Sequence, residues 1–549
     1  MDVRRLIATL SLIQCLAIAC NSTFERPSTP PQRGPDANPT PADPQPRIES
    51  SPPLLEPATP ATLFEYVATR ARRLARVAYA PRGPSLPEAL TGLTYEQYRS
   101  IQFRPEASLW QDDARFAVQL LHPGFLSQAP VRISVLQDGQ IAPLHFDKTL
   151  FRYTGDAARV ADVAAPDLGY AGFRVYYPLT SDGNREEVVV FLGASYFRLL
   201  GPDQVHGLSS RGLAVDIAVD SGEEFPAFRE FWLVRPTPEA STLTFFALLD
   251  SPSVTGAYRF DLEPGSHTTL DVDARLYARR DVTKLGVAPL SSMFLYGHNR
   301  VPAFDDFRPQ VHDSDGLLMH TSADEWIWRP LSNGPGLQVT SLRDRTPRGF
   351  GLLQRDRDFD HYLDLEARYD RRPSEWVTFG EGDWGSGGVE LLAIPTTSEF
   401  NDNIAAYWVP DQPFTTGDER QYRYRLITFN SRLDAQTLAQ VERTRIGSDA
   451  LPGQSDPPSR RRRRFIIDFS GGDMPALDRT EQVEAVLDTS AGRTSNLVVQ
   501  PLPGGRGWRA AFRLAPAGNQ PADMRLYLTL DGRRLSETWS YVWYPDHVQ

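Results

Sequence analysis

The sequence predicts a mainly β protein, in which a large antiparallel β-sandwich is followed by an immunoglobulin-like β-sandwich. Beyond residue 101 the chain consists largely of short alternating or β-branched segments bounded by Gly, Pro, Asp or Ser. No helical pattern alternates with these segments, as it would in a parallel α/β sheet. At 549 residues the chain also exceeds what one hydrophobic core supports, so at least two domains are expected.

The N-terminus has the features of an export signal over residues 1–20. A short basic start precedes an apolar run, 6–18, that is too short to span a bilayer as a permanent helix. The run ends in small residues before Cys20, which resembles a bacterial lipoprotein cleavage box. Lipid attachment at Cys20 and plain cleavage near Ala19 remain open alternatives. Either way we expect a periplasmic protein.

Residues 21–60 are predicted to be a Pro-rich disordered linker, because their Pro, Thr, Ser and Asp content leaves too little apolar surface to fold.

Cys15 and Cys20 are the only cysteines, so the folded part has no disulfide or thiolate chemistry. No later segment approaches 18 uncharged apolar residues. Contact with a membrane is therefore expected only through an N-terminal lipid anchor.

The large sandwich is predicted to occupy residues 61–432. It opens with a helix over 62–80, where apolar residues recur every three to four positions, and a second short helix over 95–101. Period-two segments follow and are interpreted as antiparallel strands. Examples lie at 187–192, 242–249, 256–262 and 269–276.

A weakly helical stretch at 428–444 and a polar tract after it mark the end of the first domain. We assign residues 433–458 to a linker and residues 459–549 to an immunoglobulin-like domain, because several alternating strands occur in about a hundred residues. The predicted strands of this domain are 465–469, 483–487, 508–514, 524–530 and 538–543.

The overall charge and the missing motifs exclude several classes of function. A formal net charge of −11 gives no global attraction to phosphate backbones, so nucleic acid is not an expected partner. The signatures of zinc proteases, P-loop and dinucleotide folds and α/β-hydrolases are missing, and the nine histidines show no ligand spacing. Residues 313–316 contain only a fragment of a calcium loop. We therefore expect neither a metal nor a cofactor.

Carboxylates and aromatic residues gather in three motifs in the middle of the chain. These are HDSDG at 312–316, EWIWRP at 325–330 and NDN at 401–403. Cleaving a glycosidic bond requires one carboxylic acid to protonate the leaving oxygen and a second carboxylate to activate water. The motifs fit this need, although Asp-rich loops more often form turns, and at least one of Trp326 and Trp328 is expected in the core.

Several longer motifs resemble the bacterial periplasmic glucan biosynthesis proteins G and D, from about residue 62 to the end of the chain. The motifs are GASYFR at 193–198, GLSSRGLA at 207–214, SGEEFP at 221–226, LLDSP at 248–252, KLGVAPL at 284–290, SMF at 292–294, GLLQR at 351–355 and LSETWSY at 535–541. The resemblance implies a mutarotase-like supersandwich and a role in making periplasmic β-1,2-linked glucan. The sequence does not separate the G from the D subgroup.

Some members of this family are similar to inverting endo-β-1,2-glucanases, and the resemblance carries over their functional positions. It implies that Asp313 is the general base and Asp402 the general acid, with Glu399 and Tyr369 linked to the same site.

Trp328 and Trp384 complete the set as residues expected to contact the sugar. Trp384 lies on a Gly-rich loop, 380–388, that is expected to close over the glucan.

Two functions follow from these expectations. The first is an enzyme that hydrolyses or transfers β-1,2-glucan in the periplasm by inverting acid/base chemistry. The alternative is a non-catalytic module that binds β-glucan and assists a membrane glucan synthase as its partner.

Overall fold

The computed structural model describes residues 59–81, 86–163, 168–181, 183–299, 305–382, 384–450 and 453–547. The predicted signal (1–20, with Cys20) and linker residues up to 58 lie outside this range. The chain forms two compact units: one ends at Pro289 and takes in Pro413–Ile427, and the other comprises Leu290–Gln412 and the chain from Thr428 onward. Within the described residues no helix is long and apolar enough to cross a membrane. The mainly β prediction is confirmed.

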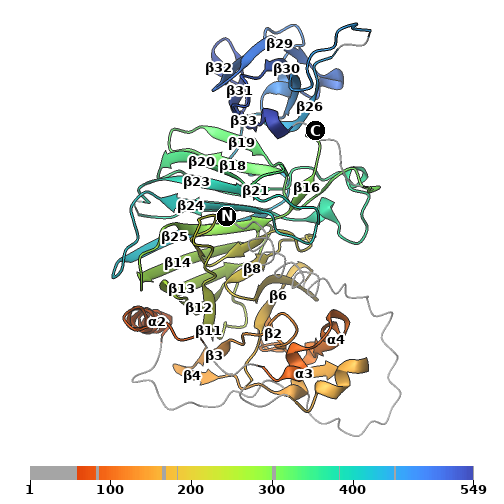
Figure 1. Cartoon of the computed structure of the whole chain (residues 1–549). Coiled ribbons are helices and arrows are strands. Elements are labelled where there is room, and N and C mark those ends of the chain that lie inside the picture. Colours follow the sequence, from red (N-terminus) through yellow and green to blue (C-terminus); the bar gives the residue numbers. More distant parts are fainter. Residues whose placement is uncertain are drawn as a thin grey trace, which may run out of the picture. The chain divides into compact units, whose positions relative to one another are not determined.

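The first unit contains two sheets. Its strands are β1 (Ile101–Phe103), β2 (Ala117–Leu121), β3 (Arg132–Gln137), β4 (Gln140–Pro143), β5 (Phe151–Tyr153), β6 (Gly172–Ser181), β7 (Asn184–Leu192), β8 (Tyr196–Leu199), β9 (Ser209–Arg211), β10 (Ala214–Val215), β11 (Ala227–Val234), β12 (Leu243–Asp250), β13 (Val254–Glu263), β14 (Thr269–Ala278), β15 (Leu285–Ser292) and β25 (Glu419–Phe429). One sheet has the order β25-β14-β13-β12-β11-β3-β4, the other β2-β6-β7-β8-β9-β15. A separate pair joins β1 and β5. In Figure 1 the strands β11 to β14 lie side by side.

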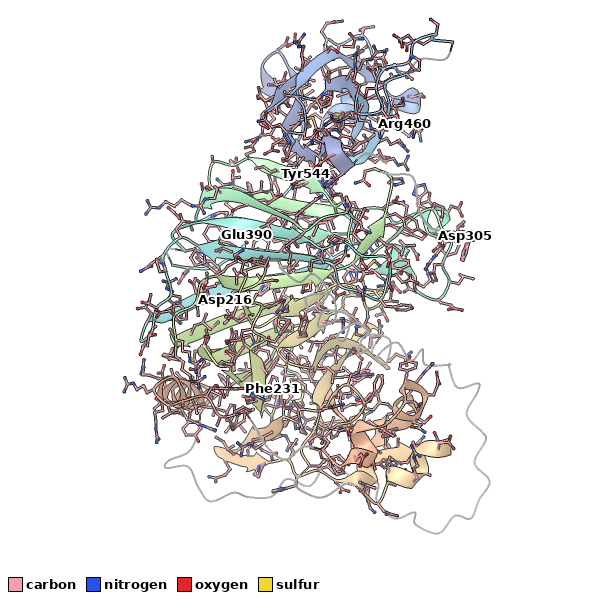
Figure 2. The ribbon with its side chains drawn as sticks, viewed as in Figure 1. Asp216, Phe231, Asp305, Glu390, Arg460 and Tyr544 are labelled. Atoms are coloured by element: carbon pink, nitrogen blue, oxygen red, sulfur yellow. The ribbon has the colours of Figure 1, made fainter. Side chains whose placement is uncertain are left out.

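Phenylalanines fill the space between these two sheets. Phe173 on β6 and Phe191 on β7 contact Phe231 on β11 with ring centroids 5.1 and 5.5 Å apart, and Phe245 on β12 lies 5.3 Å from Phe191. All four rings are buried; Figure 2 labels Phe231 among the side chains. The sheets therefore pack face to face as a sandwich.

The first predicted helix is present as α2 (Pro60–Ala75), which begins at a capping box on Thr59. Its apolar stripe, including Leu63 and Val67, packs on β12 to β14. The helix ends five residues earlier than expected. The physical reason is Arg279, whose guanidinium donates hydrogen bonds to the Leu74 and Val77 carbonyls and so satisfies the end of the helix. The remaining short helices are α3 (Glu88–Thr91), α4 (Tyr95–Arg99), η1 (Pro105–Ala107), η2 (Lys148–Leu150) and η3 (Gly155–Val160).

His122 is buried in an aromatic pocket of the first unit. Its Nδ1 lies 2.6 Å from the Pro123 carbonyl, which only accepts, and its Nε2 lies 3.0 Å from the Tyr153 hydroxyl. The ring is therefore neutral, donating from Nδ1 and accepting at Nε2. Burial lowers the pKa of His122 from its usual 6.5 to about 4.

Acidification is expected to destabilise the protein through His122. Because its folded pKa lies below the unfolded value, the unfolded chain binds the proton first, and the contribution of the neutral ring is lost as the pH falls from 6.5 towards 4. Between neutral pH and pH 5 this loss is about 2 kcal/mol. Urea unfolding of the wild type and of His122→Gln at both pH values measures it. An equal pH response in the two proteins would contradict the assignment.

The second unit carries the remaining elements. Its strands are β16 (Phe294–Tyr296), β17 (Val311–His312), β18 (Gly316–His320), β19 (Trp326–Pro330), β20 (Gln338–Arg345), β21 (Gly349–Leu353), β22 (Ser374–Phe379), β23 (Ser386–Ala393), β24 (Ile404–Pro410), β26 (Gln440–Ser448), β27 (Arg463–Ser470), β28 (Glu484–Thr489), β29 (Arg493–Pro501), β30 (Trp508–Ala515), β31 (Ala522–Leu530), β32 (Arg533–Arg534) and β33 (Thr538–Trp543). Short 3-10 helices are η4 (Phe359–His361), η5 (Tyr369–Arg371), η6 (Met474–Ala476), η7 (Pro503–Gly505) and η8 (Pro545–His547).

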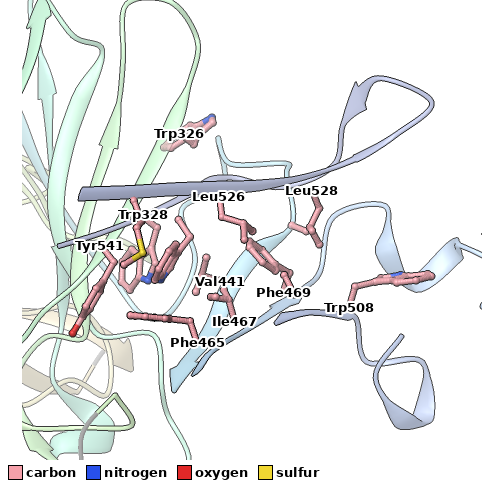
Figure 3. Packing of buried hydrophobic residues seen from close by; sticks show 14 of the residues in the cluster. Trp326, Trp328, Val441, Phe465, Ile467, Phe469, Trp508, Leu526, Leu528 and Tyr541 are labelled. Atoms are coloured by element: carbon pink, nitrogen blue, oxygen red, sulfur yellow. The ribbon is translucent and has the colours of Figure 1, made fainter. Parts of the chain in front are cut away.

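The C-terminal strands form a smaller sandwich. The sheet β26-β27-β30-β29 faces the strands β28, β31 and β33 across one apolar core. Figure 3 shows Phe465, Ile467 and Phe469 from β27 facing Leu526 and Leu528 from β31. β33 also pairs in parallel with β19, so this sandwich shares a sheet with strands from residues 290–412.

The weakly helical interpretation of residues 428–444 is wrong. The structure places β26 (Gln440–Ser448) there, paired antiparallel with β27, and no helix between 428 and 439. The side chain of Val441 enters the C-terminal core. Cross-strand pairing and burial decide the conformation of this segment, over a weak local preference. The predicted domain limits at 432 and 459 remain a prediction.

Candidate active site

Asp313 follows directly on the short strand β17. β17 pairs with β16 through His312 and Phe294, whose rings stack at 5.3 Å. The backbone N–H of Asp313 donates to the Met293 carbonyl at 2.8 Å. Asp313 is 1% exposed. Its position is therefore fixed by the residue just before β16.

Asn403, the neighbour of Asp402, is bound to the first residue of β16, Phe294. The Asn403 side chain accepts from the Phe294 N–H at 2.8 Å and donates to the Phe294 carbonyl at 3.1 Å. Its amide also donates to the Ile394 carbonyl at 3.0 Å. Asp402 itself is 3% exposed. Asp313 and Asn403, ninety positions apart in the sequence, are thus hydrogen-bonded to the consecutive residues Met293 and Phe294.

Arg372 forms an ion pair with Asp313. Its Nη1 donates to Asp313 Oδ1, while Nε and Nη2 donate to the Ala367 carbonyl at 3.2 and 3.1 Å. The guanidinium also lies 4.3 Å from the centre of the Tyr369 ring. Burial alone would lower the pKa of Arg372, but the neighbouring Asp313 and Tyr369 raise it. Arg372 therefore stays charged beside the carboxylate.

Glu399 connects Tyr369 to a second arginine. The Tyr369 hydroxyl donates to Glu399 Oε2 at 2.5 Å, and Arg308 Nη1 donates to the same oxygen at 2.8 Å. Arg308 also binds Asp306 and Asp364, and its hydrogen bonds lower the pKa of Asp306 to about 2. Burial raises the pKa of Tyr369 well above its ordinary value, so its hydroxyl stays a donor. The structure thus brings Glu399, Tyr369 and Asp313 into one network.

Removing the Tyr369 hydroxyl is expected to destabilise the protein by about 1 to 2 kcal/mol, because a part-buried carboxylate loses a donor while keeping Arg308. Tyr369→Phe measured by urea unfolding tests this. Tyr277→Phe, which removes the hydroxyl of a buried tyrosine of the first unit, is the control. If Tyr369→Phe lowers the free energy of unfolding by no more than Tyr277→Phe does, the result would contradict the network.

His312 and Gln354 join this network to the neighbouring loop. Gln354 Oε1 lies 2.9 Å from His312 Nδ1, and its amide nitrogen donates to the carbonyls of His312 and Tyr369 at 2.9 and 3.1 Å. Burial lowers the pKa of His312. Gln354 therefore binds both the side chain and the backbone of His312, the residue that precedes Asp313.

Trp328 and Trp384 take no part in the hydrogen bonds that join Asp313, Tyr369 and Glu399 to their partners, and they lie among apolar residues instead. Trp328 lies in the C-terminal core with Arg355 stacked on its ring at 3.6 Å, and Trp384 is buried against Phe379 at 4.0 Å. Each ring has one face covered by its neighbour, so core packing explains the burial of both. Their contact with the sugar stays a prediction.

Sequence reasoning missed a cluster of two histidines and one carboxylate. His298 and His361 both contact Asp356, and the ligand atoms of all three lie within 4.8 Å of one another. The residues are 58 and five positions apart, so no local spacing motif marks them. The histidines show no ligand spacing along the sequence, and folding brings these two to one carboxylate.

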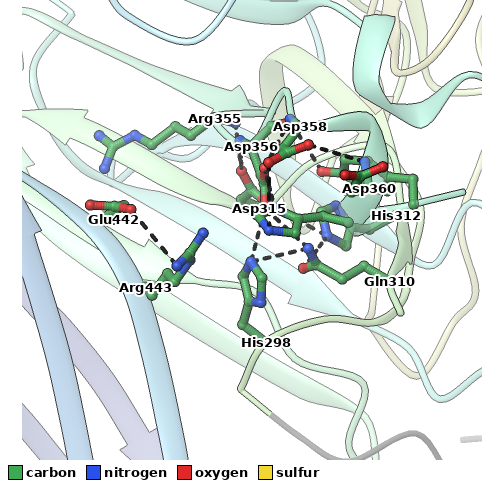
Figure 4. Close-up of polar contacts among 12 residues, drawn as sticks. His298, Gln310, His312, Asp315, Arg355, Asp356, Asp358, Asp360, Glu442 and Arg443 are labelled. Atoms are coloured by element: carbon green, nitrogen blue, oxygen red, sulfur yellow. Dashed lines mark hydrogen bonds and ion pairs between the residues drawn. The ribbon is translucent and has the colours of Figure 1, made fainter. Parts of the chain in front are cut away.

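A pocket opens beside this cluster. It has an empty volume of about 430 Å³, and its lining includes His298, Gln310, Asp315, Trp328, Arg355 and Arg443. Figure 4 shows the polar contacts around it. Asp315 closes one side, because its Oδ2 accepts the N–H groups of Arg355 and Asp356 at 2.5 and 2.9 Å. Asp315 is thus used as a loop cap, as the turn-forming alternative anticipated.

The fold and the site define a mainly β protein with a buried acidic and aromatic centre. The chain belongs to the family described as periplasmic glucan biosynthesis protein, MdoG, whose model matches residues 63–543. The resemblance to this family is confirmed.

Relatives of both subgroups match at the same level. The probable glucans biosynthesis protein D of Shewanella oneidensis is 42% identical over 485 residues, covering 88% of each chain. The glucans biosynthesis protein G of Ralstonia nicotianae is 42% identical over 485 residues, covering 87% of this chain and 95% of its own. A solved polysaccharide lyase matches with a TM-score of 0.22 and 7% identity over 68% of this chain and 44% of its own, which supports no argument.

Proposed function

We propose that this protein acts in periplasmic glucan biosynthesis by cleaving or transferring β-1,2-glucan with inverting acid/base chemistry. Asp402 protonates the glycosidic oxygen, a water attacks the anomeric carbon from the opposite face, and Asp313 accepts the proton of that water. The bond to the leaving sugar breaks as the bond to water forms. The product then carries the inverted anomeric configuration.

One observation carries the proposal: Asp313 is hydrogen-bonded to Met293, and Asn403, the neighbour of Asp402, is hydrogen-bonded to the next residue, Phe294. A general base must be ionised, and an arginine partner such as Arg372 favours the ionised form of a carboxylate. A general acid must hold its proton, and burial disfavours the charged form of a carboxyl group. The ion pair with Arg372 therefore supports the role of Asp313 as the base, and the burial of Asp402 supports its role as the acid.

Linear β-1,2-glucan incubated with the untagged protein tests this proposal. We expect new reducing ends, and proton NMR of the first products should show the α anomer, because a β linkage is inverted. Longer chains without new reducing ends would indicate transfer. Products that begin as the β anomer would contradict the inverting chemistry.

A second candidate function is glucan binding without catalysis, in assistance of a membrane glucan synthase. The burial of both aspartates, at 1% and 3% exposure, favours it. Calorimetric titration with the same glucan separates the two functions: binding without any new products supports the module, and neither binding nor products would contradict both.

A further inference from the structure

We propose that His298, Asp356 and His361 form a binding site for a divalent transition-metal cation of the zinc class. The three side chains come from separate segments of the second unit: the loop after β16, the loop after β21, and the end of η4. Two imidazoles and one carboxylate are the protein ligands of many zinc and iron sites. The cluster is distinct from the Asp313 and Glu399 network.

The spacing of the ligand atoms fits a cation. Asp356 Oδ2 lies 2.9 Å from His298 Nε2 and 2.7 Å from His361 Nδ1. Bonds of about 2.0–2.1 Å to the ion separate neighbouring ligand atoms by about 3.0 Å in an octahedral site and about 3.4 Å in a tetrahedral one. A small outward movement of the carboxylate therefore makes room for the ion.

The protonation of the two rings is compatible with binding. In this conformation each ring nitrogen that faces Asp356 is at hydrogen-bond distance from the carboxylate. When a cation replaces these hydrogen bonds, each neutral imidazole keeps one proton by carrying it on its outward nitrogen. For His361 that nitrogen lies 3.8 Å from an Asp358 carboxylate oxygen, which would orient the ring as carboxylates do behind metal-bound histidines.

The charges around the cluster favour a cation. The Asp358 carboxylate lies 3.8 Å from His361 Nε2, and the Asp315 carboxylate accepts the Asp356 N–H at 2.9 Å. Two arginines flank Asp356 in sequence: Arg355 is neutralised by Glu537 at 2.6 Å, and Arg357 donates to the carbonyls of Asp370 and Arg372. Imidazole nitrogen prefers zinc, copper, iron and nickel. A site with two histidines therefore disfavours calcium and magnesium.

The neighbouring pocket offers both access and a further ligand. His298, Gln310 and Asp356 line it (Figure 4). The Gln310 side-chain nitrogen lies 3.0 Å from His298 Nε2 and 3.1 Å from Asp356 Oδ2. Rotating this amide by half a turn would present its oxygen to the ion instead. Water from the pocket would complete the coordination.

A bound ion would join three segments next to the candidate active site. Gln310 is hydrogen-bonded to His312 at 3.1 Å, and His312 precedes Asp313. Metal binding is therefore expected to stabilise the folded chain by mass action. It would also restrain the segment that leads into Asp313.

The site is tested by adding Zn²⁺ or Co²⁺ to untagged protein from which a chelator has removed bound metal. We expect one Zn²⁺ per chain by calorimetry, a rise in Tm on adding Zn²⁺, and visible d–d absorption of bound Co²⁺. His361→Ala and His298→Ala should each weaken Zn²⁺ binding by roughly 100-fold. His320→Ala is the matched control, because His320 pairs with a single carboxylate, Asp324, at 2.8 Å.

The outcomes separate the metal site from a purely hydrogen-bonded cluster. Absence of Zn²⁺ and Co²⁺ binding to the wild type would overturn the proposal, and so would binding that survives both the His298 and His361 substitutions. Binding lost only in His320→Ala would also overturn it. If the variants fail to fold, the spectrum of Co²⁺ on the wild type decides, because nitrogen ligands give a spectrum different from that of the aqueous ion.

Discussion

Replacing Asp402 by Asn should lower the rate of β-1,2-glucan cleavage by about 10²- to 10⁴-fold, because an amide cannot protonate the leaving oxygen. Glucan affinity should change little, since the substitution keeps the size of the side chain. Asp313→Asn should cause a loss of similar size, because water then lacks its base. Initial rates of reducing-end release measure both effects. Because the two residues act on one transition state, the double variant should lose much less than the sum of the free-energy losses of the two single variants.

Asp449→Asn is the matched control for Asp313→Asn. Asp449 is also a buried aspartate held by arginines, with Arg513 and Arg462 at 2.8 and 3.1 Å, but it lies in the C-terminal sandwich. A loss of activity in all three variants would indicate general destabilisation. Full activity in Asp402→Asn, with the wild type active, would exclude the acid role.

Much of the fold follows from local patterns in the sequence. The alternation of Met524, Leu526 and Leu528 with polar neighbours predicts β31, and all three side chains are buried in the C-terminal core. Local patterns fail where distant contacts decide. The end of α2 depends on Arg279, about two hundred residues away, and β26 depends on pairing with β27.

Motifs of a known family, and not the spacing of residues along the chain, predict the candidate site. Asp313 and Asp402 stood out because of the HDSDG and NDN motifs. Arg372 and Arg308, which bind Asp313 and Glu399, carry no local signal, since any of the chain's many arginines could take these roles. The pairing of a side chain across the fold requires the fold itself.

Glu537 holds together the C-terminal sandwich and the loop that follows β21. It is fully buried, accepts from Arg355 Nη1 and Nη2 at 2.6 and 3.0 Å, and accepts the Val441 N–H at 2.7 Å. Arg355 in turn stacks on Trp328. The carboxylate therefore satisfies both a buried guanidinium and a strand N–H.

Glu537→Gln should destabilise the protein by about 3–5 kcal/mol, because removing one charge of a buried pair leaves the other uncompensated. Glu419→Gln is the matched control: Glu419 makes an equally close two-bond contact with Arg72, but both side chains are nearly half exposed. That variant should lose no more than about 1 kcal/mol. Guanidinium unfolding measures both losses. Equal losses in the two variants would mean that the burial of Glu537 does not set its contribution to stability. The expected difference would show that burial makes this ion pair indispensable at the residue that precedes β33 and beside the pocket-lining residue Arg355.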